Sequence, residues 1–541
     1  MSTAGRTALG LAIALLAAGA GLPPAGRAAQ TSGFPAGYSG YHTYAEMVDE
    51  LDSVVAAHPD IAAKMALPPN GATSYQGRTI WALKISDNVN TDEAEPEVLF
   101  DSLTHAREHL TVEMDLHLIH LLVDGYGNNQ RITDIVNNTE IWVVPMVNPD
   151  GGEYDISGDS FKNWRRNRQP VVSGKSPGID LNRNYAFKWG CCGGSSGKPG
   201  ALYYRGQYPW QAVEAAAMRD FVLSRVVGGR QQITESVTWH SFNEQIMWPY
   251  GYTYADLPRT MSPDDLVAFR ALGEGMASRN GYTAQQLSDL YIADGTSADW
   301  QYGDQRIFAL TIEMYPTDNS HVGGFYPPDS IIDRETTRND QAVLWFLEQA
   351  DCPYRAAGMG DTHCGPLNDD FETARGWQVN PTGDDTATSG AWRRGTPQKN
   401  KTAAGVMQRA YGFSGLAALV TGAARGSSAN ADDLDGASSV RSVPITLGSG
   451  SSSGWTLAFR YTFAHDTRSS SADFLRVSVG GTVVWSQTGA AANRNAAWTP
   501  VTVDLDAFAG QTVHVLIEAC DCASDSLVEA AVDDVRIYQA P

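Results

Sequence analysis

Up to about residue 351 the chain alternates short apolar runs with helix-like segments, and this alternation limits the possible folds most strongly. The helix-like segments repeat apolar residues every three or four positions, whereas the apolar runs are short enough to be buried strands. The expected helices are residues 44–57, 110–122, 212–226 and 264–280, and the expected strands are residues 78–86, 98–103, 140–147, 236–241 and 306–315. Such an order builds a sheet covered by helices on both faces. We therefore predict an α/β domain over residues 34–351, with a mixed, mostly parallel sheet.

The composition changes near residue 351. Residues 352–367 are rich in Gly, Pro and polar side chains, which predicts a linker. Residues 368–541 are rich in Gly, Ser, Thr and Ala and contain short alternating runs such as TLAFRYTF, FLRVSVGG and AAVDDVRIY. Short strands at this spacing indicate an all-β sandwich, which we expect to be an accessory domain.

Residues 1–29 have the features of an export signal. Arg6 precedes an apolar run over residues 8–20, and a stretch of small residues follows. The run is too short for a permanent membrane span, and no later stretch approaches the roughly 20 apolar residues that a transmembrane helix needs. We expect cleavage near Ala28 or Ala29 and a secreted, extracellular protein.

The chain is acidic, with 39 Lys and Arg residues, 61 Asp and Glu residues and a formal net charge of −22. Nucleic acids and anionic membranes both demand basic surface, so we expect neither as a partner. The acidic clusters could hold calcium. The length of 541 residues is enough for two or more domains, and we expect a monomer.

The six cysteines form three close pairs: Cys191 with Cys192, Cys352 with Cys364, and Cys520 with Cys522. An even number of cysteines in an exported chain indicates disulfides. Zinc is the alternative, but no third and fourth ligand lies at the spacing of a zinc finger.

One turn combines a histidine and a carboxylate that could share a metal ion. The sequence VLFDSL leads into His105 and Glu108, and a helix-like segment begins at Leu110. A strand-to-helix turn can aim both side chains at one ion, and catalytic zinc uses three protein ligands of this kind with one position open. The alternative is a solvated His and Glu pair.

Two more candidates stand at the ends of expected strands. His240 follows SVTW, and Glu313 lies near the end of FALTIEMY. Ligands of open α/β sheets bind beyond the carboxyl ends of the strands. A carboxylate among apolar residues is costly without a partner, and near an activated water it could be a general base. The alternatives are a capped loop histidine and a carboxylate paired with an arginine.

Arginines cluster in two loop-like stretches of this acidic chain. FKNWRRNRQP contains Arg165, Arg166 and Arg168, and IDLNRNYAF contains Asn182 and Arg183. Because the guanidinium fork matches a carboxylate, the cluster predicts recognition of an anion. Surface salt bridges are the alternative.

Seven separated motifs together resemble a known family, the zinc metallocarboxypeptidases of the carboxypeptidase A/B superfamily. In order along the chain they are HAREH, NPDG, WRRNR, DLNRNY, TWHS, LYIADG and TIEMYP. The tracts AREHLTVEM, NPDGGEYDIS and LNRNYAFKWGCCGGSSG are most similar to the bacterial carboxypeptidase T type. The resemblance covers about residues 34–355 and implies hydrolysis of the C-terminal peptide bond of peptides and proteins.

The resemblance also implies roles for individual residues. Glu313 would activate the attacking water and pass its proton to the leaving amine, and Arg165 would stabilise the oxyanion. The zinc ligands would be His105, Glu108 and His240. The residues around the substrate would be Asn182 and Arg183 on its terminal carboxylate, Tyr291 closing over it, and Arg107 in the next subsite.

The pocket for the C-terminal side chain is expected to be uncharged. Members specific for basic residues carry an acid where this chain has Ala298, and the carboxypeptidase T type carries an aspartate where it has Thr296. The resemblance therefore implies a preference for hydrophobic or aromatic C-terminal residues. Asp289 and Asp294 lie nearby in the sequence and could admit Lys or Arg.

Carboxypeptidase T-like enzymes bind calcium, and two sets of residues here match their sites. Clustered carboxylates repel one another unless a hard cation lies among them, and calcium takes about six to eight oxygens. The first set is Asp87, Asp92, Glu93, Glu95, Glu97 and Glu140, and the second is Ser39, Tyr41 and Glu46. A solvated acidic loop is the alternative.

Family members often carry an inhibitory prosegment, which we do not expect here. The expected signal leads almost directly into SGYHTYAEM, which resembles a mature start.

Two rival functions are a relative that acts on another amide, such as a cell-wall peptide, and a binding protein with an idle enzyme domain. Action on another amide is disfavoured because the residues matched to substrate binding are all present. An idle enzyme domain is disfavoured because the three zinc ligands and Glu313 are all present.

Overall fold

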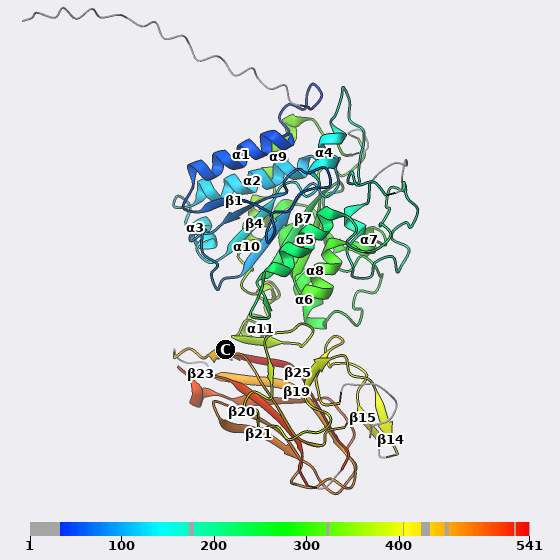
Figure 1. The fold of residues 1–541 in the computed structure, drawn as a ribbon. Helices are drawn as coiled ribbons and strands as arrows, with labels where there is room; N and C mark the ends of the chain where they lie inside the picture. Colours follow the sequence, from blue (N-terminus) through cyan, green and yellow to red (C-terminus); the bar gives the residue numbers. More distant parts are fainter. Residues whose placement is uncertain are drawn as a thin grey trace, which may run out of the picture.

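The structure of the chain is a computed structural model that describes residues 33–171, 178–320, 324–403, 405–422, 433–449, 454–523 and 526–539. The predicted export signal, residues 1–29, lies outside the described residues. An α/β part and a β-rich part follow one another along the chain (Figure 1). In the described part of the chain, no helix has the length and apolar character needed to cross a membrane.

Within the described residues, eight strands of the α/β part form one sheet in the order β1-β2-β4-β3-β7-β10-β8-β9. The central strands β4, β3, β7 and β10 run parallel to one another, as do β8 and β9, and the remaining neighbours are antiparallel. The bounds are β1 Ala62–Ala66, β2 Trp81–Ile85, β3 Glu97–Asp101, β4 Glu140–Val144, β7 Ile233–Ser241, β8 Gln245–Trp248, β9 Thr283–Gln286 and β10 Phe308–Met314. The predicted mixed, mostly parallel sheet is confirmed.

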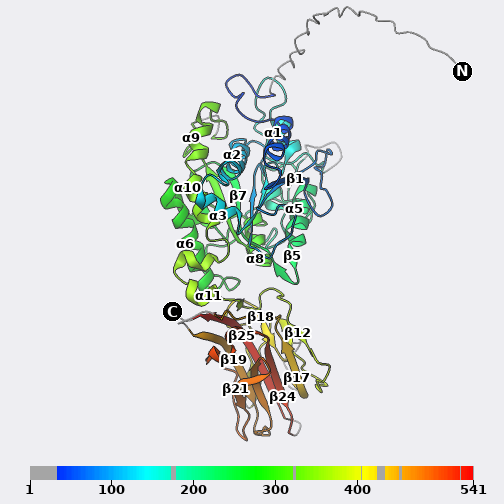
Figure 2. The same ribbon diagram turned by 90° about the vertical axis from the view of Figure 1, so that its left-hand side faces the viewer.

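Side chains of the central strands enter two separate cores. In β4, Ile141 and Val143 belong to one core, whereas Trp142 and Val144 belong to the other, because successive side chains of a strand point to opposite faces. Figure 2 shows α2, α6, α9 and α10 on one side of the sheet and α5 on the other. The bounds are α1 Tyr44–Ala57, α2 Leu110–Gly125, α3 Gln130–Val136, α5 Val213–Ser224, α6 Pro263–Asn280, α8 Ser297–Gln305, α9 Ile332–Thr337 and α10 Asp340–Leu347.

Local capping explains where several helices begin and end. The Thr43 side chain accepts a hydrogen bond from Glu46 N, and the Glu46 carboxylate binds back to Thr43 N, so α1 begins with a capping box. Ser262 caps α6, which ends at Gly281 in the left-handed conformation that glycine adopts without steric cost. These signals lie in the sequence next to the helices that they bound.

The C-terminal part consists of antiparallel β-sheets with a core of its own. One sheet has the order β13-β16-β25-β19-β22, with β11 also paired to β25, and the other has the order β12-β17-β24-β20-β21. The bounds of the longer strands are β17 Gly436–Arg441, β19 Trp455–His465, β20 Phe474–Val479, β21 Thr482–Thr488, β22 Thr499–Asp504, β24 Val515–Asp521 and β25 Val528–Gln539. The shorter strands are β11 Leu367–Asp369, β12 Gln378–Val379, β13 Arg393–Gly395 and β16 Ala418–Val420.

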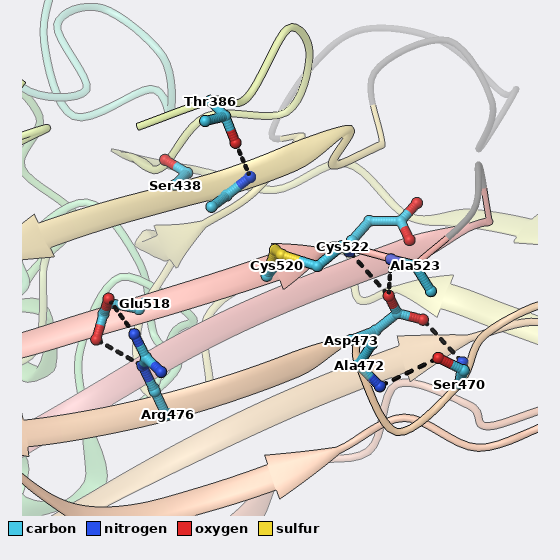
Figure 3. The surroundings of a disulfide bond; sticks show 12 residues. Thr386, Ser438, Ser470, Ala472, Asp473, Arg476, Glu518, Cys520, Cys522 and Ala523 are labelled. Atoms are coloured by element: carbon cyan, nitrogen blue, oxygen red, sulfur yellow. Dashed lines mark hydrogen bonds and ion pairs between the residues drawn. A yellow bond between two sulfur atoms is a disulfide. The ribbon is translucent and has the colours of Figure 1, made fainter. Parts of the chain in front are cut away.

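All six cysteines lie in the described part of the chain and form the three disulfides expected from their spacing. Cys520–Cys522 closes the end of β24 (Figure 3). Beside it, the Asp473 carboxylate accepts hydrogen bonds from the backbone N–H groups of Cys522 and Ala523, at 2.9 and 3.0 Å. This disulfide therefore supports the sandwich and lies among residues that contribute nothing to the site described below.

Arginines tie the β-rich part to the α/β part. The Arg306 guanidinium, next to the end of α8, lies 3.1 Å from the Glu372 carboxylate, and Arg306 Nη1 donates to the Thr260 carbonyl. From the other side, Arg536 of β25 lies 3.3 Å from Asp264 at the start of α6. Between the two parts, the stretch predicted as a linker carries the short helices η3 Pro353–Ala357 and α11 Gly360–His363.

Candidate active site

The turn between β3 and α2 carries two of the candidate metal ligands. Within it, Glu108 N–H donates to the His105 carbonyl at 3.1 Å, and Ala106 N–H donates to the Arg165 carbonyl at 3.0 Å. The Thr111 hydroxyl donates to the Glu108 carbonyl at 2.7 Å. The turn is therefore fixed from both ends, and it holds the two side chains on the same side.

His240 on β7 completes a buried group of three. The ligand atoms of His105, Glu108 and His240 all lie within 4.8 Å of one another. The two imidazole Nδ1 atoms are 3.0 Å apart, and His240 Nδ1 lies 2.9 Å from a Glu108 oxygen. Burial and the facing His105 lower the pKa of His240 to about 4, which leaves a lone pair available for a metal.

This donor set fits a zinc ion. Two imidazoles and one carboxylate are a common catalytic zinc site, and nitrogen ligands about 2.0–2.1 Å from a tetrahedral ion lie about 3.3 Å apart. The observed separation of 3.0 Å between the two Nδ1 atoms is close to that value.

Asp180 is a site residue that the sequence reasoning missed. It caps the short helix η1 Leu181–Arg183, and its Oδ1 lies 3.3 Å from His105 Nε2. Its other oxygen accepts a hydrogen bond from Arg165 Nε at 3.0 Å. A carboxylate on the second nitrogen of a metal-binding histidine fixes the ring orientation. Its position just before LNR predicts a helix cap, but no local sequence pattern predicts its contact with His105.

Glu313 lies beside His240, because β10 pairs with β7 in parallel with these two residues opposite each other. Their side chains therefore share a face of the sheet. Among the described residues, Glu313 Oε2 is buried and has no hydrogen-bond partner. Burial, together with the charge of Glu108, raises the pKa of Glu313 well above its usual range.

Arg165 and Arg107 present buried, unpaired donors. Asp180 holds Arg165 Nε, while Arg165 Nη2 lacks a partner in the part of the chain that the structure describes. Arg107 Nη1 donates to the Asn163 side chain at 2.9 Å, its guanidinium lies 3.7 Å from the centre of the Phe325 ring, and its Nε is equally unpaired. Unpaired buried donors are costly, so a bound ligand is the expected partner of both.

The predicted carboxylate-binding residues form a connected group. Asn182 Nδ2 lies 3.3 Å from His240 Nε2, and the side-chain oxygen Oδ1 of Asn182 accepts a hydrogen bond from Ser297 N–H at 2.8 Å. Arg183 is almost fully buried, and its Nη2 lies 3.4 Å from the hydroxyl of Tyr291. Tyr291 is itself 42% exposed, so its ring borders solvent at the edge of this group.

The residues expected to line the pocket for the C-terminal side chain lie at the start of α8. Thr296 caps this helix through a hydrogen bond from Asp299 N–H, and Ala298 is buried. The Asp289 carboxylate caps the short helix α7 Leu287–Leu290. The Asp294 carboxylate accepts hydrogen bonds from the loop around Cys192. Both oxygens of Asp294 therefore have other partners, whereas Asp289 is exposed and accepts from Gln286 N–H through one oxygen.

The arginines next to Arg165 lie against aromatic rings. The Arg166 guanidinium is 5.0 Å from the centre of the Trp164 ring, and its Nη1 donates to the Ala201 carbonyl. Arg168 stacks on Tyr154 at 3.5 Å. Of the three arginines in FKNWRRNRQP, Arg165 is the one whose Nε binds Asp180 beside the candidate metal site.

The acidic residues of the first expected calcium set fall into two groups. Asp87, Glu93 and Glu95 bring ligand atoms within 4.8 Å of one another, and so do Asp92, Glu97 and Glu140. In the second group, Arg225 and Lys84 bind the carboxylates at 2.5–2.8 Å and offset two of their three charges.

Among the described residues, no Lys or Arg side chain forms an ion pair with a carboxylate of the first group. Each of its three carboxylates has one buried oxygen without a hydrogen-bond partner in the described structure. Partial burial, then the charges of Glu93 and Asp87, raise the pKa of Glu95 to about 7. The other expected set differs: Glu46 caps α1, and Tyr41 donates to the Pro327 carbonyl, so a cation beside Ser39 stays a prediction.

Comparison with known proteins agrees with this site. The family model described as zinc carboxypeptidase matches residues 47–342. A zinc carboxypeptidase from Saccharothrix mutabilis subsp. capreolus is 48% identical over 328 residues, which are 61% of this chain and 74% of that protein. Carboxypeptidase A1 from Sus scrofa is 29% identical over 310 residues, covering 57% of this chain and 69% of that protein.

A solved structure shares the fold. The crystal structure of thrombin activatable fibrinolysis inhibitor matches 57% of this chain and 74% of its own, with 25% sequence identity and a TM-score of 0.51. The His105, Glu108 and His240 group lies inside the matched family region. The chain therefore belongs to the zinc carboxypeptidase family, peptidase M14, and is a zinc metallocarboxypeptidase.

Proposed function

We propose that this enzyme is secreted and removes single residues from the free C-terminus of peptides and proteins. One observation carries the proposed activity: the ligand group, the Glu313 carboxylate and the buried Arg183 guanidinium come together at the ends of β7 and β10, and Glu313 Oε2 has no partner among the described residues. A guanidinium in a closed site favours a substrate with a free carboxylate. That requirement distinguishes an exopeptidase from an endopeptidase.

The zinc ion, when bound, supplies a Lewis acid and lowers the pKa of water. The side chains of this chain supply the rest. Glu313 takes a proton from the attacking water and returns it to the leaving amine. The free Nη2 of Arg165 donates to the scissile carbonyl oxygen as negative charge develops there. Arg183, Asn182 and Tyr291 hold the terminal carboxylate and so set which bond is cut.

The proposal is tested with an N-blocked dipeptide that ends in phenylalanine. We expect cleavage of the free acid, loss of cleavage after a chelator removes the metal, and recovery with zinc. The matched control is the same dipeptide with a C-terminal amide, which offers Arg183 no negative charge and should be cleaved at least about 100-fold more slowly. Equal rates for acid and amide would rule out the carboxypeptidase assignment of this site.

We propose a preference for hydrophobic or aromatic C-terminal residues. Its support is that Ala298 and Thr296 are uncharged and that Asp289 and Asp294 bind backbone groups. Ala298→Asp is expected to raise kcat/KM for a lysine-ended dipeptide by at least about tenfold, because a carboxylate in the pocket pairs with the ammonium. Ala298→Asn adds the same volume without the charge and should not do so. Faster cleavage of lysine-ended than phenylalanine-ended dipeptides by the unchanged enzyme would reject the preference.

We propose one structural calcium ion at Asp87, Glu93 and Glu95, in keeping with the likeness to the carboxypeptidase T type. With zinc present throughout, calcium at about 100 times its Kd is expected to add about 2.7 kcal/mol to stability and so raise Tm by several degrees. Glu95→Gln should abolish this rise. Asp92→Asn, in the neighbouring group, should keep the rise because Asp92 already pairs with Arg225. A Tm that does not change when calcium is added would exclude the ion.

Secretion is proposed from the signal-like residues 1–29. The expected result is protein in the culture medium whose N-terminus begins near residue 29 or 30, as read by N-terminal sequencing. Protein that stays in the cell with residues 1–29 attached would contradict it. The expected monomer is checked by light scattering of the same material.

A further inference from the structure

We propose that Asp294 is a positioning residue, which holds the loop of residues 191–195 so that this loop fixes the Arg183 guanidinium for the substrate carboxylate. Asp294 lies in the fully buried stretch after Tyr291. Its Oδ2 accepts hydrogen bonds from the backbone N–H groups of Cys192 and Gly194, at 2.9 and 3.0 Å, and its Oδ1 accepts one from the Ser195 hydroxyl. One carboxylate thus gathers three donors from four consecutive residues.

The same loop reaches Arg183 through a carbonyl group. Arg183 Nε donates to the Gly194 carbonyl at 3.0 Å, and Arg183 Nη1 donates to the Asn182 carbonyl at 2.6 Å. The loop is also in close contact with its support, since a Cβ on Gly194 would lie 2.5 Å from Ala293 Cα. The position of the Gly194 carbonyl, and with it the orientation of the guanidinium, therefore depends on Asp294.

The disulfide between adjacent Cys191 and Cys192 restricts the loop further. It joins neighbouring residues in a small ring, which limits the conformations open to the backbone that presents the Cys192 N–H to Asp294. Both cysteines are exposed, so the ring adds no apolar core. Its effect is to fix the loop before substrate arrives, and fixing a binding group in advance lowers the entropy lost on binding.

This arrangement assigns Asp294 a role other than charge recognition. Its two oxygens are occupied by the loop, so it orients the residue that binds the carboxylate and does not contact the substrate side chain. The inference rests on the proposed role of Arg183 as the carboxylate anchor. It predicts that changes at Asp294 act on the binding of every substrate with a free C-terminus, whatever its last side chain.

The test compares Asp294→Asn with the unchanged full-length enzyme. The asparagine oxygen can still accept from the Cys192 and Gly194 N–H groups, and its NH2 can donate to the Ser195 hydroxyl, but these bonds lose the carboxylate charge that strengthens them. KM for a phenylalanine-ended blocked dipeptide, and Ki for free phenylalanine, are therefore expected to rise about tenfold. kcat and zinc content should change less than about twofold. A fall in kcat as large as the rise in KM, or no change in KM, would overturn the inference.

A double-mutant cycle separates this inference from the function on which it rests. Arg183→Lys alone should raise KM strongly, and adding Asp294→Asn to it should change KM by less than about twofold. No effect of Arg183→Lys would reject the anchor itself. Fully additive effects would reject only the link from Asp294 to Arg183.

The disulfide gives a second test that leaves Asp294 in place. The double variant Cys191→Ser with Cys192→Ser is expected to raise KM about threefold, in the same direction as Asp294→Asn. Cys520→Ser with Cys522→Ser removes the disulfide of the sandwich and should leave KM unchanged. An unchanged KM in the first double variant, or an equal rise in the second, would count against a positioning role for the loop.

Discussion

Glu313→Gln is expected to lower kcat by about 10³-fold while zinc stays bound and KM changes little. The glutamine keeps the shape of the side chain, but its amide oxygen cannot take a proton from water. The unpaired Oε2 of Glu313, beside His240 in the register of β10 and β7, is the atom that the change removes. The measurement is kcat and KM on the phenylalanine-ended dipeptide, with zinc content determined on the same sample.

Glu235→Gln is the matched control for this variant. Glu235 is fully buried, lacks hydrogen-bond partners within the described residues, and, like Glu313, has a pKa raised well above its usual range by burial. Glu235 pairs with Phe308 at the start of β10. It precedes His240 on β7 by five residues, so the two residues lie about 17 Å apart along the strand. Its kcat should stay within about twofold of the unchanged enzyme. Similar losses in both variants would show general damage to the sheet.

Arg165→Gln is expected to lower kcat by about 10²- to 10³-fold, with a smaller change in KM. The free Nη2 of Arg165 can donate to the developing oxyanion, and the Asp180 carboxylate holds the guanidinium in place through Nε. The matched control is Arg166→Gln, because Arg166 binds the Ala201 carbonyl and lies against Trp164. The control should lose less than about threefold in kcat. A kcat for Arg165→Gln within threefold of the unchanged enzyme would remove Arg165 from the mechanism.

Much of the site could be predicted because its residues lie at the ends of regular elements. The strand EIWVV and the helix after His105 are recognisable from patterns a few residues long, since apolar periodicity reports which face of an element is buried. Parallel strands bring their carboxyl ends to one edge, so His240 and Glu313 could be expected to lie near each other. In the structure, these two residues lie opposite each other on the neighbouring strands β7 and β10.

Other parts of the site depended on contacts between distant segments. Asp180 reaches His105 and Arg165 from a separate loop, and its sequence shows only a helix cap. The sequence alone makes Asp294 a possible partner for a basic substrate, whereas in the structure it binds the loop around Cys192. Such pairings follow no local period and cannot be derived from spacing along the chain.

By itself, the sequence determined which chemical groups this protein has and in which elements they lie: an imidazole and carboxylate on a turn, a second imidazole and a carboxylate at strand ends, and arginines in loops. Only the tertiary structure decided which of these groups remain free. Arg225 and Lys84 pair with the carboxylates of one acidic group. Within the described residues no cation pairs with Asp87, Glu93 or Glu95, and Glu313 and Arg165 keep unpaired atoms in the site. The reason is physical: a charge is satisfied or available according to what folding places within a few ångströms of it, and that partner can come from anywhere in the chain.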